Sequence, residues 1–223
     1  MIHWPIAALE LATPRLRMRL PSARELDELA NLATAGIHDP ETPSVRILMA
    51  NHAPVQTARR VMEHHWSSWM FWKPKDWRLT LAVFLDGTAI GTQVLAAEGF
   101  TTHRQVKTLS WLGKDFQDPG LAVEMRAAVL HLAFAGLGAR EAVAFVEKTG
   151  SPIVSRKLGY RDDGVEHFPF RGENMAAQRL RLSRADWEAH RRTEVGMERL
   201  EPCLPMFGLP AAEGPGITAP DHR

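Results

Sequence analysis

The sequence predicts an α/β (α+β) protein in which a mixed β-sheet is covered by helices. Two features carry this prediction. Several short stretches alternate polar and apolar residues, which is typical of half-buried strands, and longer ones repeat apolar residues at helical spacing. The expected order is a strand, two helices, a hairpin, a strand, a long helix, a strand, a short helix and a final pair of strands. A central sheet flanked by helices accommodates this order.

The first strand is expected at residues 16–20, where arginine alternates with apolar residues. Ser22 and Glu25 have the spacing of a capping box, so a helix should begin here and run to about Ala33. After an irregular connection, a second helix is expected at residues 55–71.

A hairpin follows the second helix. Residues 79–85 and 89–96 have the composition of strands, and Asp86-Gly87 between them is a strong turn signal. Residues 106–113 form the next predicted strand.

The C-terminal half begins with a long amphipathic helix that starts near Gly120. A buried strand at 142–147, a short helix at 151–158, a strand at 175–182 and a helix at 184–192 complete the predicted domain. We place this domain at residues 1–197. Proline and glycine dominate residues 198–223, which predicts a C-terminal tail without regular structure.

Composition excludes several classes of protein. The chain has 223 residues, a formal net charge of +1 and a single cysteine, Cys203. It therefore has no overall charge that would attract nucleic acid, no intrachain disulfide and no cysteine-based zinc site. It has no uninterrupted apolar run of 18 residues, and its N-terminus is a poor signal peptide. We expect a soluble, cytoplasmic protein that is not associated with membranes.

The segment from Ser110 to Met125 is the most informative. A strand ends, a short loop containing Gly113 follows, and an amphipathic helix begins near Gly120. Free backbone N–H groups and the positive end of a helix bind anions, so a pyrophosphate would fit here. An ordinary strand-to-helix turn has the same spacing.

Two motifs give the chain a family resemblance. Residues 117–122 match the acyl-CoA signature Q/R-x-x-G-x-G/A of the GCN5-related N-acetyltransferase (GNAT) superfamily, and residues 151–160 resemble its later K-L-G-[FY] region. Residues 13–16 resemble the opening strand of the branch that acetylates ribosomal-protein N-termini, with its small-molecule-modifying relatives. The resemblance covers about residues 11–192. It implies a GNAT fold, with a central mixed, mostly antiparallel twisted sheet flanked by helices.

The resemblance also implies roles for individual residues. Acetyl-CoA would be the acyl donor, and its pantetheine arm would pair with the backbone of Trp111, Leu112 and Gly113. The pyrophosphate would be held by Gln117, Asp118, Pro119, Gly120, Leu121 and Ala122. The general acid that protonates the departing thiolate would be Ser151 or Ser155. Each of these serines is equally compatible with a helix cap or a surface hydroxyl.

The donor loop departs from the family pattern. Asp118 and Pro119 stand where relatives carry glycine and a basic residue, so the loop gains a negative charge and loses a backbone donor. Two like charges about 6 Å apart repel each other by about 3 kcal/mol at an effective dielectric of about 20, and by about 1 kcal/mol in bulk water. We hypothesise that Lys148 supplies the missing cation.

The acceptor side is predicted from the tryptophan-rich segment. Trp66, Trp69 and Trp72 repeat at helical spacing and would form an aromatic wall for a flat or cationic acceptor, although a place in the core explains them as well. His65 and His103 are candidates for contacts with the acceptor. Glu98 is the candidate general base. We predict no metal site.

These observations favour an N-acyltransferase that moves an acetyl or other short acyl group to an amine of a small molecule or a peptide N-terminus, by direct attack in a ternary complex. A role in antibiotic biosynthesis or resistance and a homodimer are further expectations. Two alternatives remain open: aminoacyl transfer from charged tRNA, which predicts salt-dependent RNA binding, and a degenerate GNAT protein that binds ligand without catalysis.

Overall fold

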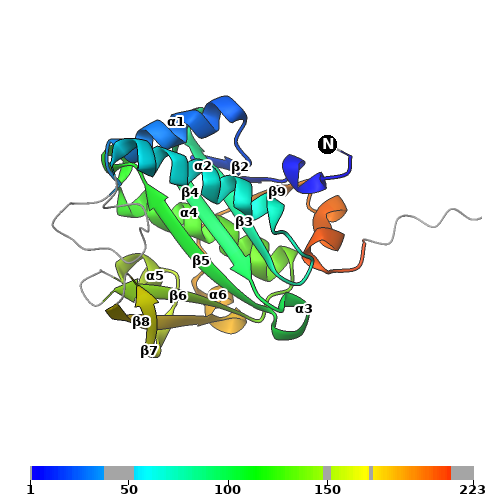
Figure 1. Ribbon diagram of the computed structural model, residues 1–223. Helices are drawn as coiled ribbons and strands as arrows, with labels where there is room; N and C mark the ends of the chain where they lie inside the picture. Colours follow the sequence, from blue (N-terminus) through cyan, green and yellow to red (C-terminus); the bar gives the residue numbers. More distant parts are fainter. Residues whose placement is uncertain (1, 38–52, 148–151, 171–172, 212–223) are drawn as a thin grey trace, which may run out of the picture.

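A computed structural model describes residues 2–37, 53–147, 152–170 and 173–211 (Figure 1). The described residues form a nine-stranded sheet in the order β7-β8-β6-β5-β4-β3-β2-β1-β9. All neighbouring strands are antiparallel except β5 and β6, which are parallel. The predicted mixed, mostly antiparallel sheet is confirmed.

The elements follow the predicted order, with additions at both ends. The strands are β1 (Glu10–Ala12), β2 (Leu16–Arg19), β3 (Trp77–Leu85), β4 (Thr88–Ala97), β5 (Gln105–Leu112), β6 (Glu141–Glu147), β7 (Arg161–Phe170), β8 (Glu173–Ser183) and β9 (Gly196–Glu198). The helices are α1 (Ala23–Thr34), α2 (Pro54–Met70), α3 (Phe100–His103), α4 (Pro119–His131), α5 (Ile153–Lys157) and α6 (Arg184–His190), with the shorter turns η1 (Pro5–Ala8), η2 (Lys114–Phe116), η3 (Leu132–Gly136) and η4 (Glu201–Phe207).

Local sequence signals explain two of these boundaries. The hydroxyl of Ser22 accepts a hydrogen bond from the backbone N–H of Glu25, whose carboxylate accepts one from the backbone N–H of Ser22, so the predicted capping box begins α1. Asp86 and Gly87 both have positive φ angles, 48° and 81°, in the tight turn between β3 and β4. Such a turn matches the twist of the strands that it joins.

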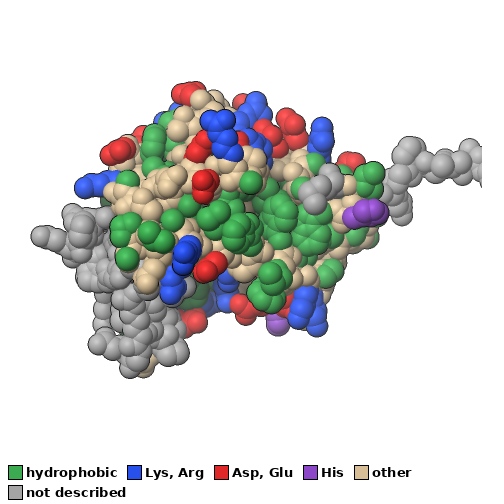
Figure 2. Space-filling view, turned by 45° about the horizontal axis from the view of Figure 1, so that its top comes forward, with side chains coloured by type: hydrophobic (Ala, Val, Ile, Leu, Met, Phe, Trp, Pro, Cys, Tyr) green, Lys and Arg blue, Asp and Glu red, His purple; other side chains and the backbone are tan. Residues whose placement is uncertain are grey.

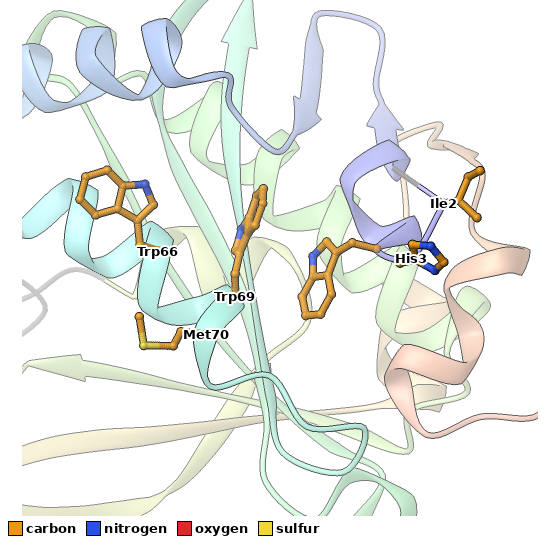
Figure 3. Close-up of a pocket in the computed structure, with 6 residues that line it drawn as sticks. Ile2, His3, Trp66, Trp69 and Met70 are labelled. Carbon is orange, nitrogen blue, oxygen red and sulfur yellow. The ribbon is translucent and has the colours of Figure 1, made fainter.

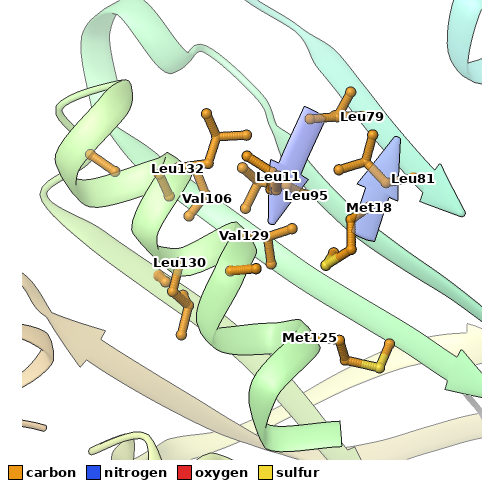
Figure 4. Packing of buried hydrophobic residues seen from close by; sticks show 14 of the residues in the cluster. Leu11, Met18, Leu79, Leu81, Leu95, Val106, Met125, Val129, Leu130 and Leu132 are labelled. Carbon is orange, nitrogen blue, oxygen red and sulfur yellow. The ribbon is translucent and has the colours of Figure 1, made fainter. Parts of the chain in front are cut away.

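Helices cover both faces of the sheet because successive strand residues point to opposite sides. On one face, Leu29 of α1 and Val61 of α2 pack with Ala82 and Phe84 of β3. On the other face lie alternate residues of the same strand, including Leu79 and Leu81, which pack under α4 residues such as Met125 and Val129 (Figure 4). The sheet therefore lies between a layer formed by α1 and α2 and a layer that contains α4.

The two parallel strands separate after a short paired stretch. Residues 105–107 of β5 pair with residues 141–143 of β6. Beyond these residues β5 continues to Leu112 and β6 to Glu147 without ladder pairing between their described residues. This opening leaves backbone groups of the two strands without ladder partners, although the carbonyl oxygen of Leu112 accepts a hydrogen bond from the side chain of Gln117 at 3.4 Å.

The segment after residue 197 corrects one expectation. Residues 198–209 are not an unstructured tail, because β9 pairs with β1 and η4 packs into the core. Cys203 and Phe207 are both fully buried, and the indole N–H of Trp72 donates to the carbonyl oxygen of Met206 at 2.7 Å. Residues 212–223 lie outside the described residues. Within the part of the chain that the structure describes, none of the helices has both the length and the apolar character to cross a membrane.

Candidate donor and acceptor sites

Strand β5 presents two backbone positions to the opening. The N–H of Gly113 donates to the carbonyl oxygen of Ile90, at 2.9 Å, and thus faces β4. Because backbone groups alternate in direction along a strand, Trp111 also faces β4, whereas Leu112 and Ser110 face the opening. Of the residues predicted to contact pantetheine, Leu112 is the one whose backbone is suitably directed, and Ser110 is an additional position that the sequence did not indicate.

In the loop before α4, a carboxylate of the loop itself binds a backbone N–H group at the start of the helix. Asp118 is the N-cap of α4, and its Oδ1 accepts the N–H of Gly120 at 2.8 Å. Pro119 follows at the first helical position and has no N–H to offer. Leu121 is buried and Ala122 packs against the core. Of the expected phosphate donors, Pro119 therefore has no N–H, and the N–H groups of Gln117, Asp118, Gly120 and Ala122 already donate within the loop.

Gln117, the first residue of the predicted signature, has another function in this loop. Its side-chain amide donates to the carbonyl oxygen of Ile37, which ties the loop to the segment after α1. This hydrogen bond fixes the donor loop against the residues that follow α1.

A cation stands beside the loop, and it is Arg15 from the turn before β2. Its Nε donates to the carboxylate of Glu124 at 2.6 Å, and its Nη1 lies 3.9 Å from the carboxylate of Asp118. Thr13 donates to the same Glu124 carboxylate at 2.6 Å. Burial alone would raise the pKa of Glu124, but the hydrogen bonds from Thr13 and Arg15 lower it below its usual value. Glu124 is thus a carboxylate that holds Arg15 at the start of α4.

In the sequence, the alternation of Arg15, Arg17 and Arg19 is typical of the solvated face of a strand. No local pattern could reveal the position of Arg15, because Glu124 is 109 residues away. Lys148, the cation proposed from the sequence, lies outside the described residues, as does Ser151.

A second arginine lies inside the site, on the α4 side of the sheet. Arg126 is 5% exposed, and its two terminal nitrogens donate to the hydroxyls of Ser155 at 2.9 Å and Ser110 at 3.2 Å. It thereby links α4 with β5 and α5. Beside it, the hydroxyl of Tyr160 lies 3.4 Å from that of Thr108. Burial raises the pKa of Tyr160, an effect that the charge of Arg126 reduces. The tyrosine is therefore neutral.

The sequence carried one signal for Arg126, namely a charged residue within an otherwise apolar helix. In the sequence this charge interrupts the longest apolar stretch, residues 121–137, and so argues only against a membrane span. Ser155, predicted as a general acid, is 1% exposed and lies within the Arg126 cluster.

Glu98 directly follows β4 and pairs with a lysine of β5. This carboxylate is exposed and pairs with Lys107 at 3.1 Å. Lys107 is the last β5 residue in the pairing with β6, so Glu98 lies close to the point where the strands separate. Its exposure leaves it accessible to an acceptor. His103 is exposed at the end of α3, and its ring packs over Gly99 rather than beside Ser155.

Of the predicted acceptor residues, His65 is buried and Trp72 is partly buried in an aromatic cluster. His65 is 3% exposed and lies 3.4 Å from the hydroxyl of Thr92 on β4. Burial, with a smaller effect of His64, lowers the pKa of His65 to about 3, so this imidazole is neutral. Trp72 lies beyond the end of α2, stacked on Trp77 with ring centroids 6.0 Å apart.

Trp66 and Trp69 instead line a shallow surface pocket of about 700 Å³, together with Met70 and residues 2–4 at the N-terminus (Figure 3). Figure 2 shows hydrophobic side chains gathered on the face that carries α2. The pocket borders the aromatic cluster at the end of the sheet where β5 begins, whereas the donor loop follows the end of β5. Trp69, which stacks on Trp4, therefore belongs to the end of the sheet remote from the donor loop.

Comparison with known proteins assigns the chain to a family. A family model described as the acetyltransferase (GNAT) domain matches residues 15–161. RimJ of Mycobacterium smegmatis, solved with CoA-disulfide, superposes with a TM-score of 0.60 at 15% identity, over 85% of this chain and 98% of that one. A GCN5-related N-acetyltransferase from Brucella melitensis gives a TM-score of 0.62 at 18% identity, over 81% and 80% of the two chains.

A third similar structure is a spermidine N-acetyltransferase, a SpeG chimera from Vibrio cholerae and hSSAT, with a TM-score of 0.55 at 15% identity over 78% of this chain and 98% of that one. These likenesses concern the fold, and the matching family model covers well over half of the sequence. The chain therefore belongs to the GNAT family of acyl-CoA-dependent N-acetyltransferases.

Proposed function

We propose that this enzyme transfers an acetyl or other short acyl group from acyl-CoA to a primary amine of a small molecule or a peptide N-terminus. The observation that carries this proposal is the separation of β5 from β6, followed directly along the chain by the donor loop and the start of α4. An extended pantetheine arm can pair with the freed backbone groups of β5 as an added strand would.

The donor site is proposed on the following residues. The backbone of Ser110 and Leu112 would bind the pantetheine arm, while the N-terminal turn of α4 and the guanidinium of Arg15 would face the pyrophosphate. The carboxylate of Asp118 opposes this binding, because it adds a negative charge and already accepts the N–H of Gly120. We therefore expect the donor to bind more weakly than the same loop would allow without Asp118.

The acceptor is proposed to approach from the α2 face, where Glu98 can accept a proton from its ammonium group. The free amine then attacks the thioester carbonyl carbon in a ternary complex, and a backbone N–H of β5 polarises the carbonyl oxygen. Ser155 is our candidate for a hydrogen bond to the departing sulfur. His65 is buried, and Trp72 packs on Trp77 and donates its indole N–H to Met206. We therefore retain only Trp66 and Trp69, which line the surface pocket, as proposed contacts for the remote part of an extended acceptor.

Calorimetric titration with acetyl-CoA, followed by thiol-release assays with an acceptor panel, tests the proposal. The panel contains spermidine, aromatic amines and a peptide with an N-terminal serine. We expect saturable binding of acetyl-CoA and acceptor-dependent release of CoA. Absence of binding at millimolar acetyl-CoA would contradict the proposal. Binding without turnover on any amine would favour the degenerate protein, and strongly salt-dependent binding of charged tRNA would favour aminoacyl transfer.

A further inference from the structure

The feature that the proposed function leaves unexplained is a permanently charged side chain buried beside the opening between β5 and β6. Arg126 is 5% exposed, and a guanidinium cannot lose its charge in a protein. Its hydrogen bonds to Ser110 and Ser155 fix the charge between β5 and α5. The two serines come from different elements, so the guanidinium lies where these elements face each other.

If Arg126 served only to join α4, β5 and α5, its burial would lower the stability of the fold. Burying a charge costs free energy that apolar side chains of similar size do not incur, and well-packed apolar replacements of buried charges are often neutral or stabilising. Met125, Ala128 and Val129 on the same helix are fully buried apolar residues, whereas Arg126 donates to the hydroxyl groups of Ser110 and Ser155. The buried charge therefore suggests a function in chemistry.

We propose that Arg126 is a catalytic residue whose guanidinium binds the sulfur of the acyl donor and stabilises the thiolate that leaves. This inference rests on the proposed acyltransferase function. The proposed pantetheine contacts run along β5 from Leu112 to Ser110, so the sulfur end of the arm arrives on the side of Ser110. The hydroxyl of Ser110 accepts a hydrogen bond from Arg126.

The chemical step requires a positive charge at this place. The amine nitrogen forms a bond to the carbonyl carbon, the C–S bond breaks, and the sulfur keeps the electron pair as a thiolate. The proton lost by the nitrogen passes through Glu98 to solvent, so charges and atoms balance. Arg126 offsets the negative charge of the thiolate within an enclosed site, where such an interaction is stronger than in water.

The neighbouring serine complements this role. Ser155 accepts a hydrogen bond from Arg126, which leaves its own hydrogen to donate to the sulfur. A serine hydroxyl is a weaker acid than a thiol, so complete proton transfer from Ser155 would be uphill. The arrangement thus stabilises a thiolate product before solvent protonates it.

The test is to measure the thiol pKa of CoA bound to the enzyme. The ultraviolet absorbance of the thiolate is followed as a function of pH, with the acetyl-CoA complex, which has no free thiol, as the blank. We expect the pKa of bound CoA to lie about one unit below that of free CoA, a tenfold increase in the thiolate fraction at low pH. The Arg126→Gln variant should lose this shift, and Arg126→Lys should keep part of it.

Arg184→Gln is the matched control. Arg184 is also partly buried and donates to backbone carbonyl groups, including that of Ala139 at 3.3 Å, but it lies at the start of α6. We expect it to leave the thiol pKa unchanged. The inference is overturned if the wild-type enzyme binds CoA without lowering its thiol pKa, a result that needs no variant to fold. It is also overturned if folded Arg126→Gln keeps the full shift. A protein that binds no CoA would instead contradict the proposed function, and this inference with it.

Discussion

Arg126 and His65 are buried on opposite faces of the same sheet, and they differ in whether the buried side chain is charged. The imidazole of His65, on α2, lies 3.4 Å from the hydroxyl of Thr92, and its Nδ1 has no hydrogen-bond partner among the described residues. Burial therefore removes its charge. Arg126, on α4, must remain charged and donates to two serines. The comparison shows that burial neutralises His65 on the α2 face, whereas a buried charge is retained at Arg126 on the α4 face.

The largest expected effect is on catalysis. Arg126→Gln should lower kcat by about 100-fold, the size of effect found when one group that stabilises transition-state charge is removed. The affinity for acetyl-CoA should change much less, because the negative charge on sulfur develops only as the thioester breaks. Steady-state kinetics and calorimetry on the same preparation measure the two quantities. If Arg126→Gln mainly weakened the binding of acetyl-CoA and left kcat nearly unchanged, the result would contradict this expectation.

The next effect concerns pH and the α2 face. The pKa of His65 is about 3 in the folded chain, against an ordinary value of 6.5. Above pH 6.5 it is neutral in both states. Below pH 6.5 the unfolded chain takes up a proton and the folded chain does not, so stability falls as the pH falls towards 3. At pH 5 this loss amounts to about 2 kcal/mol.

Replacing His65 with leucine removes the titrating group while keeping a side chain of similar size. We expect the free energy of unfolding of His65→Leu, measured with urea at pH 7 and pH 5, to fall less between the two values than that of the wild type. His64, whose pKa burial lowers to about 4, adds a loss of the same sign in both proteins. An equal fall in the two proteins would show that His65 is not buried in the neutral form.

The smallest effect is at the donor loop, where the charges are exposed to solvent. Asp118→Asn keeps a side-chain oxygen to cap α4 but removes the negative charge. Acetyl-CoA should therefore bind about fivefold more tightly, consistent with about 1 kcal/mol for a like-charge pair in solvent. Asp115→Asn, in η2, is the control, because Asp115 does not cap α4. Weaker binding by Asp118→Asn would mean that the carboxylate helps to form the donor site.

Much of the fold was predictable because its signals are local. Alternation identified the strands, Ser22 and Glu25 began α1, and Asp86-Gly87 made the hairpin. The packed segment after residue 197 was not predictable, since its proline-rich composition is typical of loops. Phe207 becomes ordered only through contacts with distant residues such as Trp72.

The site was predictable in its position along the chain but not in its charges. The signature at residues 117–122 correctly marked the start of α4. Arg15 and Arg126 act through partners that are 109 and 29 residues away in the sequence, so no spacing rule connects them. Similarly, the helical repeat of the tryptophans did not distinguish Trp72, which packs against Trp77 and Phe207, from Trp66 and Trp69, which line the surface pocket.

The most direct test of the account is a structure of the enzyme with acetyl-CoA bound. We predict that the pantetheine arm lies between β5 and β6, along the backbone of Ser110 and Leu112. Its sulfur should lie within about 4 to 6 Å of the Arg126 guanidinium, the range in which opposite charges interact strongly. A thioester bound elsewhere, or one separated from Arg126 by β5, would contradict both the donor site and the role of this arginine.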